Sequence, residues 1–211
     1  RQIAHEINNP LTPMKLTIQQ LQRTQKSEHF GEYFEKSSRL LIEQIDNLSR
    51  IATAFSNFAK MPDAKKEMVT INSPLQSVIE LFRHNNESVH ISYSTDNIAA
   101  TVWADKEQLT QVFNNVLKNA IQAIPAERKG EINIQLTETE TQVRVTIQDN
   151  GCGIPDDIRD KLFIPNFTTK SSGMGLGLAI VNNIVESSGG KIWFETQLNE
   201  GSTFFVEFPK R

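Results

Sequence analysis

A stretch near the middle of the chain has residues that could hold a ligand. Val143, Val145 and Ile147 alternate with polar residues, which is typical of a half-buried strand. Asp149 follows directly, so the sequence predicts a carboxylate where this strand ends. The glycines at 151 and 153 permit positive φ and a close approach of the backbone to a ligand.

A second stretch has glycine at every second position, at Gly173, Gly175 and Gly177, just before an apolar run over 178–181. Glycines at a helix start leave backbone N–H groups bare, and such groups form a ready site for phosphate. Together with Asp149, the pattern predicts one site with a base at one end and phosphates at the other. The alternative is two ordinary surface turns, because the spacing matches neither the dinucleotide fingerprint nor the Walker phosphate loop.

A helix beginning after Asp105 supplies polar groups of a third kind. Asp105 is an expected N-cap, and Gln108 three residues later is typical of a capping box. Asn115, Lys118 and Asn119 fall on one helix face, opposite the apolar face. A solvated surface would explain that face, but asparagine is a poor helix former, so we expect the two amides to face a ligand.

The first helix contains a possible nucleophile. His5 lies off the apolar seam and precedes Glu6, whose carboxylate could hold Nδ1–H and leave Nε2 free to react. Pro10 and Pro13 fall inside the same apolar period, where a proline costs about 3 kcal/mol. Either the helix begins at Asn9, or it is kinked, as the apolar residues upstream favour. Asn9 either caps the backbone freed by Pro10, or it lies on the same helix face as His5 and aims a water molecule at a phospho-aspartate docked there.

The first sixty residues have the apolar spacing of a helical hairpin. Steps of four and three run from Ile7 to Leu21 and again from Phe34 to Ala59, with a polar turn over 25–31 between them. Two helices bury too little apolar surface alone, so we expect a four-helix bundle built from two chains. The alternative is that the hairpin packs on the second domain. The heptads stop at 61–66, which indicates a linker.

The rest of the chain predicts an α+β sandwich with a mostly antiparallel sheet. Helices are expected from a cap at Ser73 to about Asn85, and from Asp105 to about Ile124. Strands are expected over 67–71, 89–94, 100–103, 131–137, 141–148, 191–196 and 202–208.

Composition narrows the class of protein. The chain has 211 residues and a net charge of −3, which gives no case for nucleic acid or an anionic membrane. A single cysteine excludes an internal disulfide and a cysteine-built zinc site. No apolar run reaches the roughly 18 residues needed to cross a bilayer, and no signal peptide is visible. Because the chain opens inside an apparent helix without methionine, we expect it to be a piece of a longer protein.

Several stretches, in order along the chain, resemble the motifs of bacterial sensor histidine kinases. They are the phosphoacceptor box (5–11), the asparagine box (115–120), the first glycine box (149–153), the phenylalanine box and lid start (163–170), the second glycine box (173–177) and a last-strand motif (201–204). Met174 departs from the threonine common in the second glycine box. The text from Asn9 to Pro13 resembles most the nitrogen-regulation (NtrY/NtrB-like) type.

This resemblance implies a dimerisation and histidine phosphotransfer domain over 1–62 and a Bergerat-type ATP-binding catalytic domain over 67–211. Asp149 would accept the adenine amino proton, and Asn119 with Asn115 would bind Mg²⁺ on the triphosphate. Lys118 and Lys170 would neutralise phosphate charge. Further nucleotide contacts are implied for Gly151, Gly153, Ile154, Gly173, Gly175, Leu176, Gly177 and Thr203.

The resemblance also implies the reaction and its partners. His5 would attack the γ-phosphoryl group of ATP, with Glu6 orienting the ring, and the phosphoryl group would pass to an aspartate of a response regulator. Asn9 would serve removal of phosphate from that regulator. We expect a homodimer in the cytoplasmic part of a membrane-anchored sensor. Rival interpretations are a non-catalytic or phosphatase-only module, and an ATPase or chaperone that uses ATP as a conformational switch.

Overall fold

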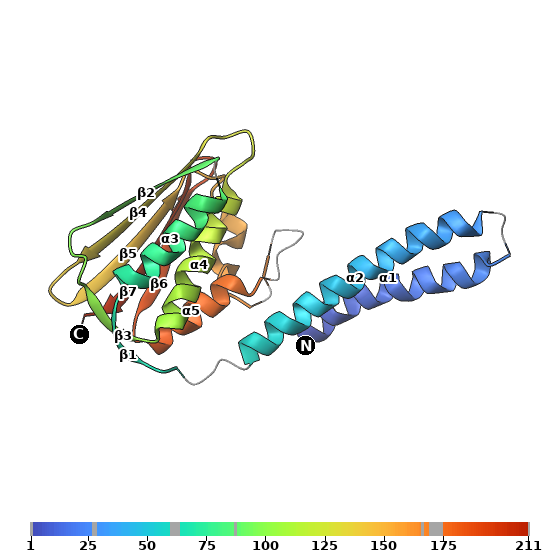
Figure 1. The fold of residues 1–211 in the computed structure, drawn as a ribbon, viewed down its shortest axis with the longest axis horizontal. Helices are drawn as coiled ribbons and strands as arrows, with labels where there is room; N and C mark the ends of the chain where they lie inside the picture. The colour runs from blue at the N-terminus through green and yellow to red at the C-terminus, as the bar shows by residue number, and fades with distance from the viewer. Residues whose placement is uncertain are drawn as a thin grey trace. The chain divides into compact units, whose positions relative to one another are not determined.

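The computed structural model describes residues 2–26, 29–59, 64–86, 88–165, 167–168 and 175–210. The chain forms two compact units, Arg1–Met61 and Pro62–Arg211, which are best considered separately (Figure 1). In the part of the chain described, no helix is both long and apolar enough to cross a membrane.

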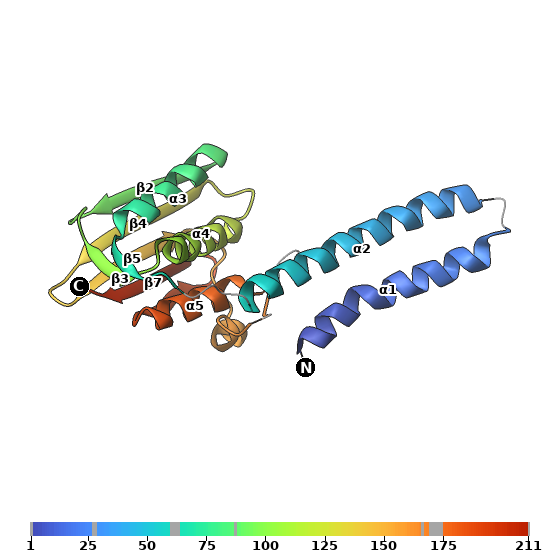
Figure 2. The same ribbon diagram turned by 60° about the horizontal axis from the view of Figure 1, so that its bottom comes forward.

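The first unit is a hairpin of two helices, α1 (Gln2–Thr24) and α2 (Phe30–Ala59), which lie side by side (Figure 2). The predicted helical hairpin is therefore confirmed. Helix α1 runs without interruption through Pro10 and Pro13, so a helix start at Asn9 is wrong. Pro10 is itself buried, and burial of its ring offsets part of the cost of the lost backbone hydrogen bond.

The hairpin leaves large apolar side chains open to solvent. Leu16 and Ile42 are each 59% exposed and Ile45 is 51% exposed, on helices that expose Leu11, Ile18, Tyr33, Phe34 and Leu40 as well. This many exposed large apolar side chains on two helices indicates an interaction site more often than a solvated surface. The hairpin thus has the unburied surface that a four-helix bundle would cover.

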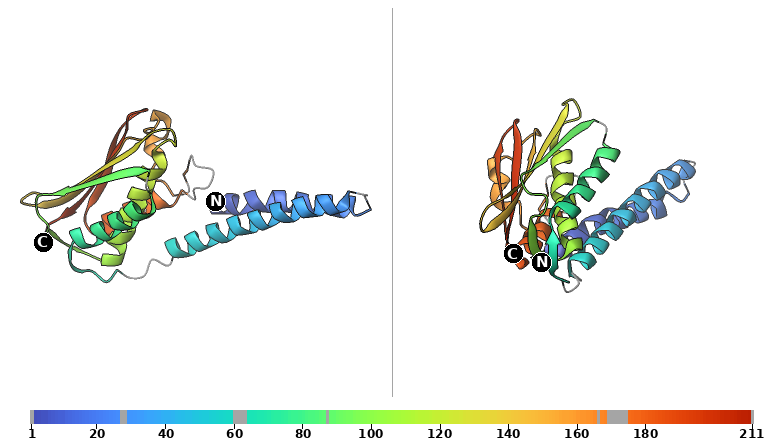
Figure 3. Two further views of the ribbon diagram at one scale, coloured as in Figure 1. Left: turned by 45° about the horizontal axis from the view of Figure 1, so that its top comes forward. Right: turned by 60° about the vertical axis from the view of Figure 1, so that its left-hand side comes forward.

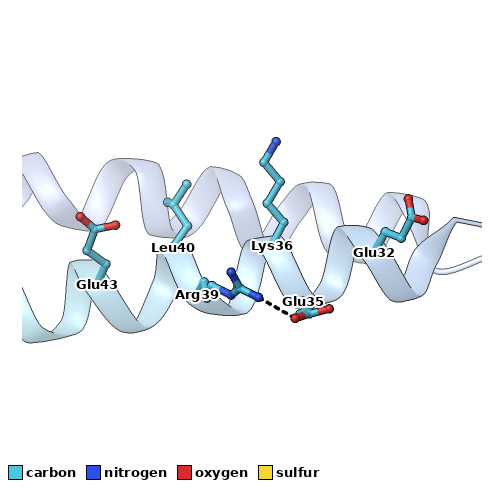
Figure 4. A pocket seen from close by; sticks show the side chains of 6 residues that line it. All are labelled: Glu32, Glu35, Lys36, Arg39, Leu40 and Glu43. Atoms are coloured by element: carbon cyan, nitrogen blue, oxygen red, sulfur yellow. Dashed lines mark hydrogen bonds and ion pairs between the residues drawn. The ribbon is translucent and has the colours of Figure 1, made fainter.

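One face of α2 carries charge instead. A hollow of about 340 Å³ lies here, lined by Glu32, Glu35, Lys36, Arg39, Leu40 and Glu43, whose side chains Figure 4 shows. The Arg39–Glu35 ion pair is 2.7 Å long, but both side chains are well exposed, so it adds little stability. This hollow shares no residue with the groups predicted to do chemistry, which lie elsewhere in the chain.

The second unit is a sandwich of helices on a sheet. The five-stranded sheet has the order β2 (Val89–Thr95), β4 (Gly130–Glu138), β5 (Gln142–Asp149), β7 (Gly201–Pro209), β6 (Lys191–Gln197). Only the β2–β4 pair among these is parallel, so the predicted mostly antiparallel sheet is confirmed. Helices α3 (Asn72–Asn85), α4 (Lys106–Ala123) and α5 (Gly177–Ser187) cover one face (Figures 1 and 3).

A two-stranded antiparallel sheet, β1 (Glu67–Thr70) with β3 (Thr101–Ala104), and a short 3₁₀ helix, η1 (Asp156–Lys161), complete the unit. The core lies between the helices and the large sheet, where alternate residues of β4, β5 and β7 are buried against the apolar face of α4. This alternation fixes the register, because a slip of one residue would turn each buried side chain outward.

The two expected helix caps have different outcomes. Asp105 does cap α4, since its Oδ1 accepts from the backbone N–H groups of Glu107 and Gln108 at 2.9 and 3.0 Å. The reciprocal half of the capping box is not made, because Gln108 Oε1 has no hydrogen-bond partner among the residues described. Ser73 is not a cap, because α3 begins one residue earlier and places Ser73 inside the helix.

Candidate nucleotide-binding site

The site is organised around Asp149, the last residue of β5. Its side chain is 4% exposed, and its Oδ1 accepts from the backbone N–H of Gly151 at 2.8 Å and of Ser202 at 3.3 Å. Strand pairing explains this geometry, because Asp149 lies opposite Ser202 on β7 and opposite Ile132 on β4. A buried carboxylate held by two backbone donors keeps its orientation, which suits recognition of a hydrogen-bond donor on a ligand.

The two glycines after Asp149 are required for different reasons. Gly153 has a φ of +71°, as predicted, and a Cβ there would lie 2.3 Å from the carbonyl oxygen of Gln197. Gly151 is not among the residues with positive φ, so that expectation is wrong for it. It needs to be glycine because a Cβ would lie 2.7 Å from the carbonyl oxygen of Ala123, at the end of α4.

The turn between β6 and β7 supports the glycine turn from the other side. Thr196 Oγ1 accepts from the N–H of Ile154 at 2.9 Å and also lies 2.9 Å from Ser202 Oγ. The N–H of Asn199 donates to the carbonyl of Cys152 at 2.8 Å. Sequence reasoning missed this support, because residues some forty positions apart meet here and nothing in the local pattern of Thr196 signals it.

The structure brings the asparagine helix and the second glycine stretch together. A Cβ on Gly177, the first residue of α5, would lie 3.5 Å from Asn115 Oδ1, in ordinary van der Waals contact. Asn115 and Asn119 are half-buried on α4, and Lys118 is exposed. Gly175 has a φ of +62°, and Leu176 is buried before the start of α5. The bare N–H groups at this helix start therefore lie beside an amide side chain.

Thr203 lies on the other face of the sheet from Asp149. On β7 the buried residues are Ser202 and Phe204, and Thr203 lies between them on the opposite face of the sheet from Asp149. Because side chains alternate along a strand, Thr203 points away from the side of Asp149, and its role as a nucleotide contact stays a prediction. Ser202 is the residue on the side of Asp149, and it is 5% exposed.

Several predicted site residues cannot be placed. His5 and Glu6 lie in helix α1, but their side chains fall outside the described part of the chain. Lys170 and Gly173 lie outside the described residues altogether.

Asn9 is exposed within α1 rather than at its start, so it does not cap the helix. Ile154 is half-buried immediately after the glycine turn.

The residues present fit a magnesium nucleotide better than a metal held by protein alone. The described residues contain no cluster of three or more histidine, cysteine, aspartate or glutamate side chains. Mg²⁺ binds through few protein groups when phosphates and water complete its shell, and an amide oxygen such as that of Asn115 or Asn119 is an acceptable ligand. The N-terminus of α5 beside Asn115 supplies the anion-binding element that the phosphates require.

Comparison with known families agrees with this geometry. Residues 104–211 match the model of the histidine kinase-, DNA gyrase B- and HSP90-like ATPases, and residues 1–62 match that of the His kinase A phosphoacceptor domain. The chain therefore belongs to this ATPase family. With the phosphoacceptor domain before the ATPase domain, it is a sensor histidine kinase catalytic core.

Curated relatives are similar along nearly the whole chain. The sensor histidine kinase ZraS of Escherichia coli (strain K12) is 32% identical over 209 residues, which are 98% of this chain and 44% of that protein. Sporulation kinase A of Bacillus subtilis (strain 168) is 34% identical over 215 residues, 99% of this chain and 34% of that protein. The chain thus spans less than half the length of these relatives.

A solved structure of similar fold is that of the histidine kinase ThkA in complex with the response regulator protein TrrA. The match extends over all of the present chain and 60% of the ThkA chain, with 29% identity and a TM-score of 0.73. The catalytic domain of ThkA alone covers 69% of this chain and 96% of that one, with 36% identity and a TM-score of 0.63. These likenesses confirm the predicted α+β fold, with a helical hairpin before an ATPase sandwich.

Proposed function

We propose that this chain transfers the γ-phosphoryl group of ATP to its own His5, and from there to an aspartate of a response regulator. The proposal is carried by the buried Asp149 carboxylate at one end of a site whose other end is the N-terminus of α5 beside Asn115. One end offers an acceptor for the adenine amino group, and the other offers N–H donors and an amide for the phosphates and their metal ion.

The nucleotide end is proposed as follows. Asp149 accepts a hydrogen bond from the adenine amino group, while Gly151 and Ser202 hold the carboxylate through their N–H groups. Asn119 and Asn115 would supply amide oxygens to Mg²⁺, which would neutralise charge that builds up on the phosphates. Lys118 is exposed on the same helix and can reach toward the phosphates as a second positive charge. Lys170 and the glycines at 173, 175 and 177 would close over the triphosphate.

The phosphoryl group is accepted by His5 of the first unit. Its Nε2 attacks the γ-phosphorus, a new P–N bond forms, and the bond from phosphorus to the ADP oxygen breaks. Glu6 accepts a hydrogen bond from Nδ1–H and so keeps the attacking nitrogen unprotonated. Catalysis of this kind is mostly positioning and charge stabilisation. In this proposal residues 1–62 are the dimerisation and phosphotransfer domain, and residues 67–211 the catalytic domain.

Two partners follow from the proposal. A second copy of the chain would cover the apolar surface that includes Leu16, Ile42 and Ile45, which one hairpin leaves open. A response regulator would be the other partner, by analogy with the complex of ThkA and the response regulator TrrA, and it would dock on the hairpin that carries His5. Asn9, exposed four residues after His5, would then aim water at the regulator's phospho-aspartate.

The subtype is a narrower proposal. We infer a kinase of the nitrogen-regulation type from the text around His5, and a putative NtrY-like sensor kinase of Rickettsia prowazekii (strain Madrid E) is 31% identical over 209 residues. ZraS is as similar as that relative, so whole-chain identity does not separate the types. A cytoplasmic position, with anchoring through another part of a longer protein, stays a prediction.

Binding of ATP tests the nucleotide site directly. Calorimetry should detect Mg²⁺-dependent binding of ATP to the whole chain, and Asp149→Asn should weaken it, because the amide can present an N–H where the adenine amino group needs an acceptor. Gln148→Asn is the matched control, since Gln148 is the exposed neighbour on the other face of β5. Absence of binding at millimolar ATP would overturn the proposal, as would equal affinity of wild type and Asp149→Asn.

A further inference from the structure

The loop between α4 and β4, residues 124–129, lies against the turn that follows Asp149. Arg128 in this loop is half-buried, and its Nη1 donates to the carbonyl oxygen of Asn150 at 2.5 Å and to that of Gly151 at 2.8 Å. One guanidinium nitrogen thus holds two successive carbonyl groups, in charge-assisted hydrogen bonds that are stronger than neutral ones.

The same loop contacts the turn at further points. Asn150 Nδ2 donates to the carbonyl of Lys129 at 2.9 Å, and Asn150 Oδ1 accepts from the N–H of Glu131 at 2.9 Å. The N–H of Cys152 donates to the carbonyl of Ala123 at 2.9 Å. The turn is therefore tied to the end of α4 and to the start of β4, and Arg128 reaches it from between these two ties.

The contacts of Arg128 fix two peptide planes. A trans peptide is planar, with its carbonyl and its N–H pointing in opposite directions. When the Asn150 carbonyl points to Arg128, the N–H of Gly151 in the same peptide points away, and it donates to Asp149 Oδ1. The next peptide has its carbonyl on Arg128 and its N–H, that of Cys152, on Ala123. Each plane is held at both ends.

We propose that Arg128 is a positioning residue for nucleotide binding, acting through the Gly151 peptide on the carboxylate of Asp149. The inference rests on the proposed function, in which that carboxylate receives the adenine. Without the guanidinium, the Gly151 peptide can rotate and Asp149 Oδ1 loses a fixed donor. The phosphate end is built on the middle of α4 and the start of α5, so it keeps its geometry. The loss therefore falls on binding of ATP rather than on transfer.

The test compares steady-state autophosphorylation of whole-chain variants as a function of ATP concentration. Arg128→Gln removes the charge, and Arg128→Lys keeps it on a different donor geometry. Arg83→Gln is the matched control, because Arg83 also donates to a backbone carbonyl, that of Ile91 at 2.7 and 3.0 Å, in contacts between α3 and β2. Melting temperature and hydrogen exchange of the peptide over 149–153 are measured for each variant.

We expect Arg128→Gln to raise KM for ATP about tenfold, equivalent to 1.4 kcal/mol, with kcat within twofold of wild type. Hydrogen exchange over 149–153 should be faster in Arg128→Gln than in wild type. Arg128→Lys should lie between wild type and Arg128→Gln in both KM and exchange rate. Arg83→Gln should lower the melting temperature about as much as Arg128→Gln does but leave KM unchanged. If Arg128 were merely structural, the two variants would affect KM alike.

Three results would overturn the inference. One is a KM within twofold of wild type in both Arg128 variants. Another is an equal rise of KM in Arg83→Gln. The third is a loss confined to kcat. If Arg128→Gln does not fold, Arg128→Lys decides by the same criteria. A wild-type chain that does not bind ATP would instead overturn the proposed function, and this inference with it.

Discussion

Replacing Gly153 by alanine should damage both stability and nucleotide binding, and a second glycine allows the two causes to be separated. Gly153 and Gly189 have φ values of +71° and +75°. The left-handed conformation costs a residue with a Cβ about 1–2 kcal/mol. At Gly189 the nearest atom to an added Cβ is Pro209 Cγ at 3.6 Å, so this conformational cost is the whole effect.

At Gly153 a steric cost comes in addition. The added Cβ would lie 2.3 Å from the carbonyl oxygen of Gln197 and 2.9 Å from Leu198 Cα, and neither backbone atom can rotate away. Overpacking of this kind costs about 1–3 kcal/mol, which brings the sum to roughly 2–5 kcal/mol. For a domain of this size each kcal/mol shifts the melting temperature by about 2–4 °C. We expect a loss of roughly 4–20 °C, against roughly 2–8 °C for Gly189→Ala.

The assay is calorimetric melting of both variants together with titration by ATP. The Gly153 variant should push the β6–β7 turn away from the glycine turn and weaken ATP binding by about tenfold, equivalent to 1.4 kcal/mol. Gly189→Ala should bind ATP like wild type, because Gly189 follows α5 at the end remote from its first residue. Equal melting temperatures of the two variants, or normal ATP affinity of Gly153→Ala, would refute this reasoning.

Three further outcomes are expected. Ile45→Glu should give a monomer by light scattering, because it buries a charge in the proposed bundle, while Lys36→Glu on the charged face of α2 should leave the dimer intact; an unchanged dimer in Ile45→Glu would refute the interface. Asn9→Ala should lose phosphatase activity toward the regulator and keep autophosphorylation, and equal loss of both would retire the role of Asn9. Burial raises the pKa of Tyr93, whose hydroxyl donates to Asn72 Oδ1 at 2.5 Å. The contribution of this tyrosine to stability is therefore complete below the unfolded pKa of about 10 and is lost as the pH rises through the folded pKa. The difference in stability between wild type and Tyr93→Phe should narrow above about pH 10, and a constant difference would contradict this.

Local rules predicted most of the fold. A few neighbouring residues specify each of three features: the cap at Asp105, the strand that ends at Asp149 and the helices of the hairpin. Each of these is present in the structure. Proline was the ambiguous signal, because an isolated helix would have begun at Asn9, whereas the apolar residues upstream keep α1 helical through Pro10.

The candidate site was predictable only in part, because its supports are long-range. The contacts of Thr196 and Arg128 with the turn after Asp149 depend on which strands pair, which the local pattern does not specify. The register of β7 places Ser202 rather than Thr203 on the side of Asp149, and the sequence motif alone does not specify that register. Gly151 was recognised for the wrong reason, since a close approach to α4 requires it rather than its φ.

Labelling with radioactive ATP tests the central claim most directly. Wild-type chain incubated with γ-labelled ATP and Mg²⁺ should acquire a label that is labile in acid and stable in base, as a phosphoramidate is. His5→Gln should bind ATP normally and take up no label, whereas His29→Gln, which changes the exposed histidine before α2, should be labelled like wild type. A label that persists in His5→Gln would contradict the account.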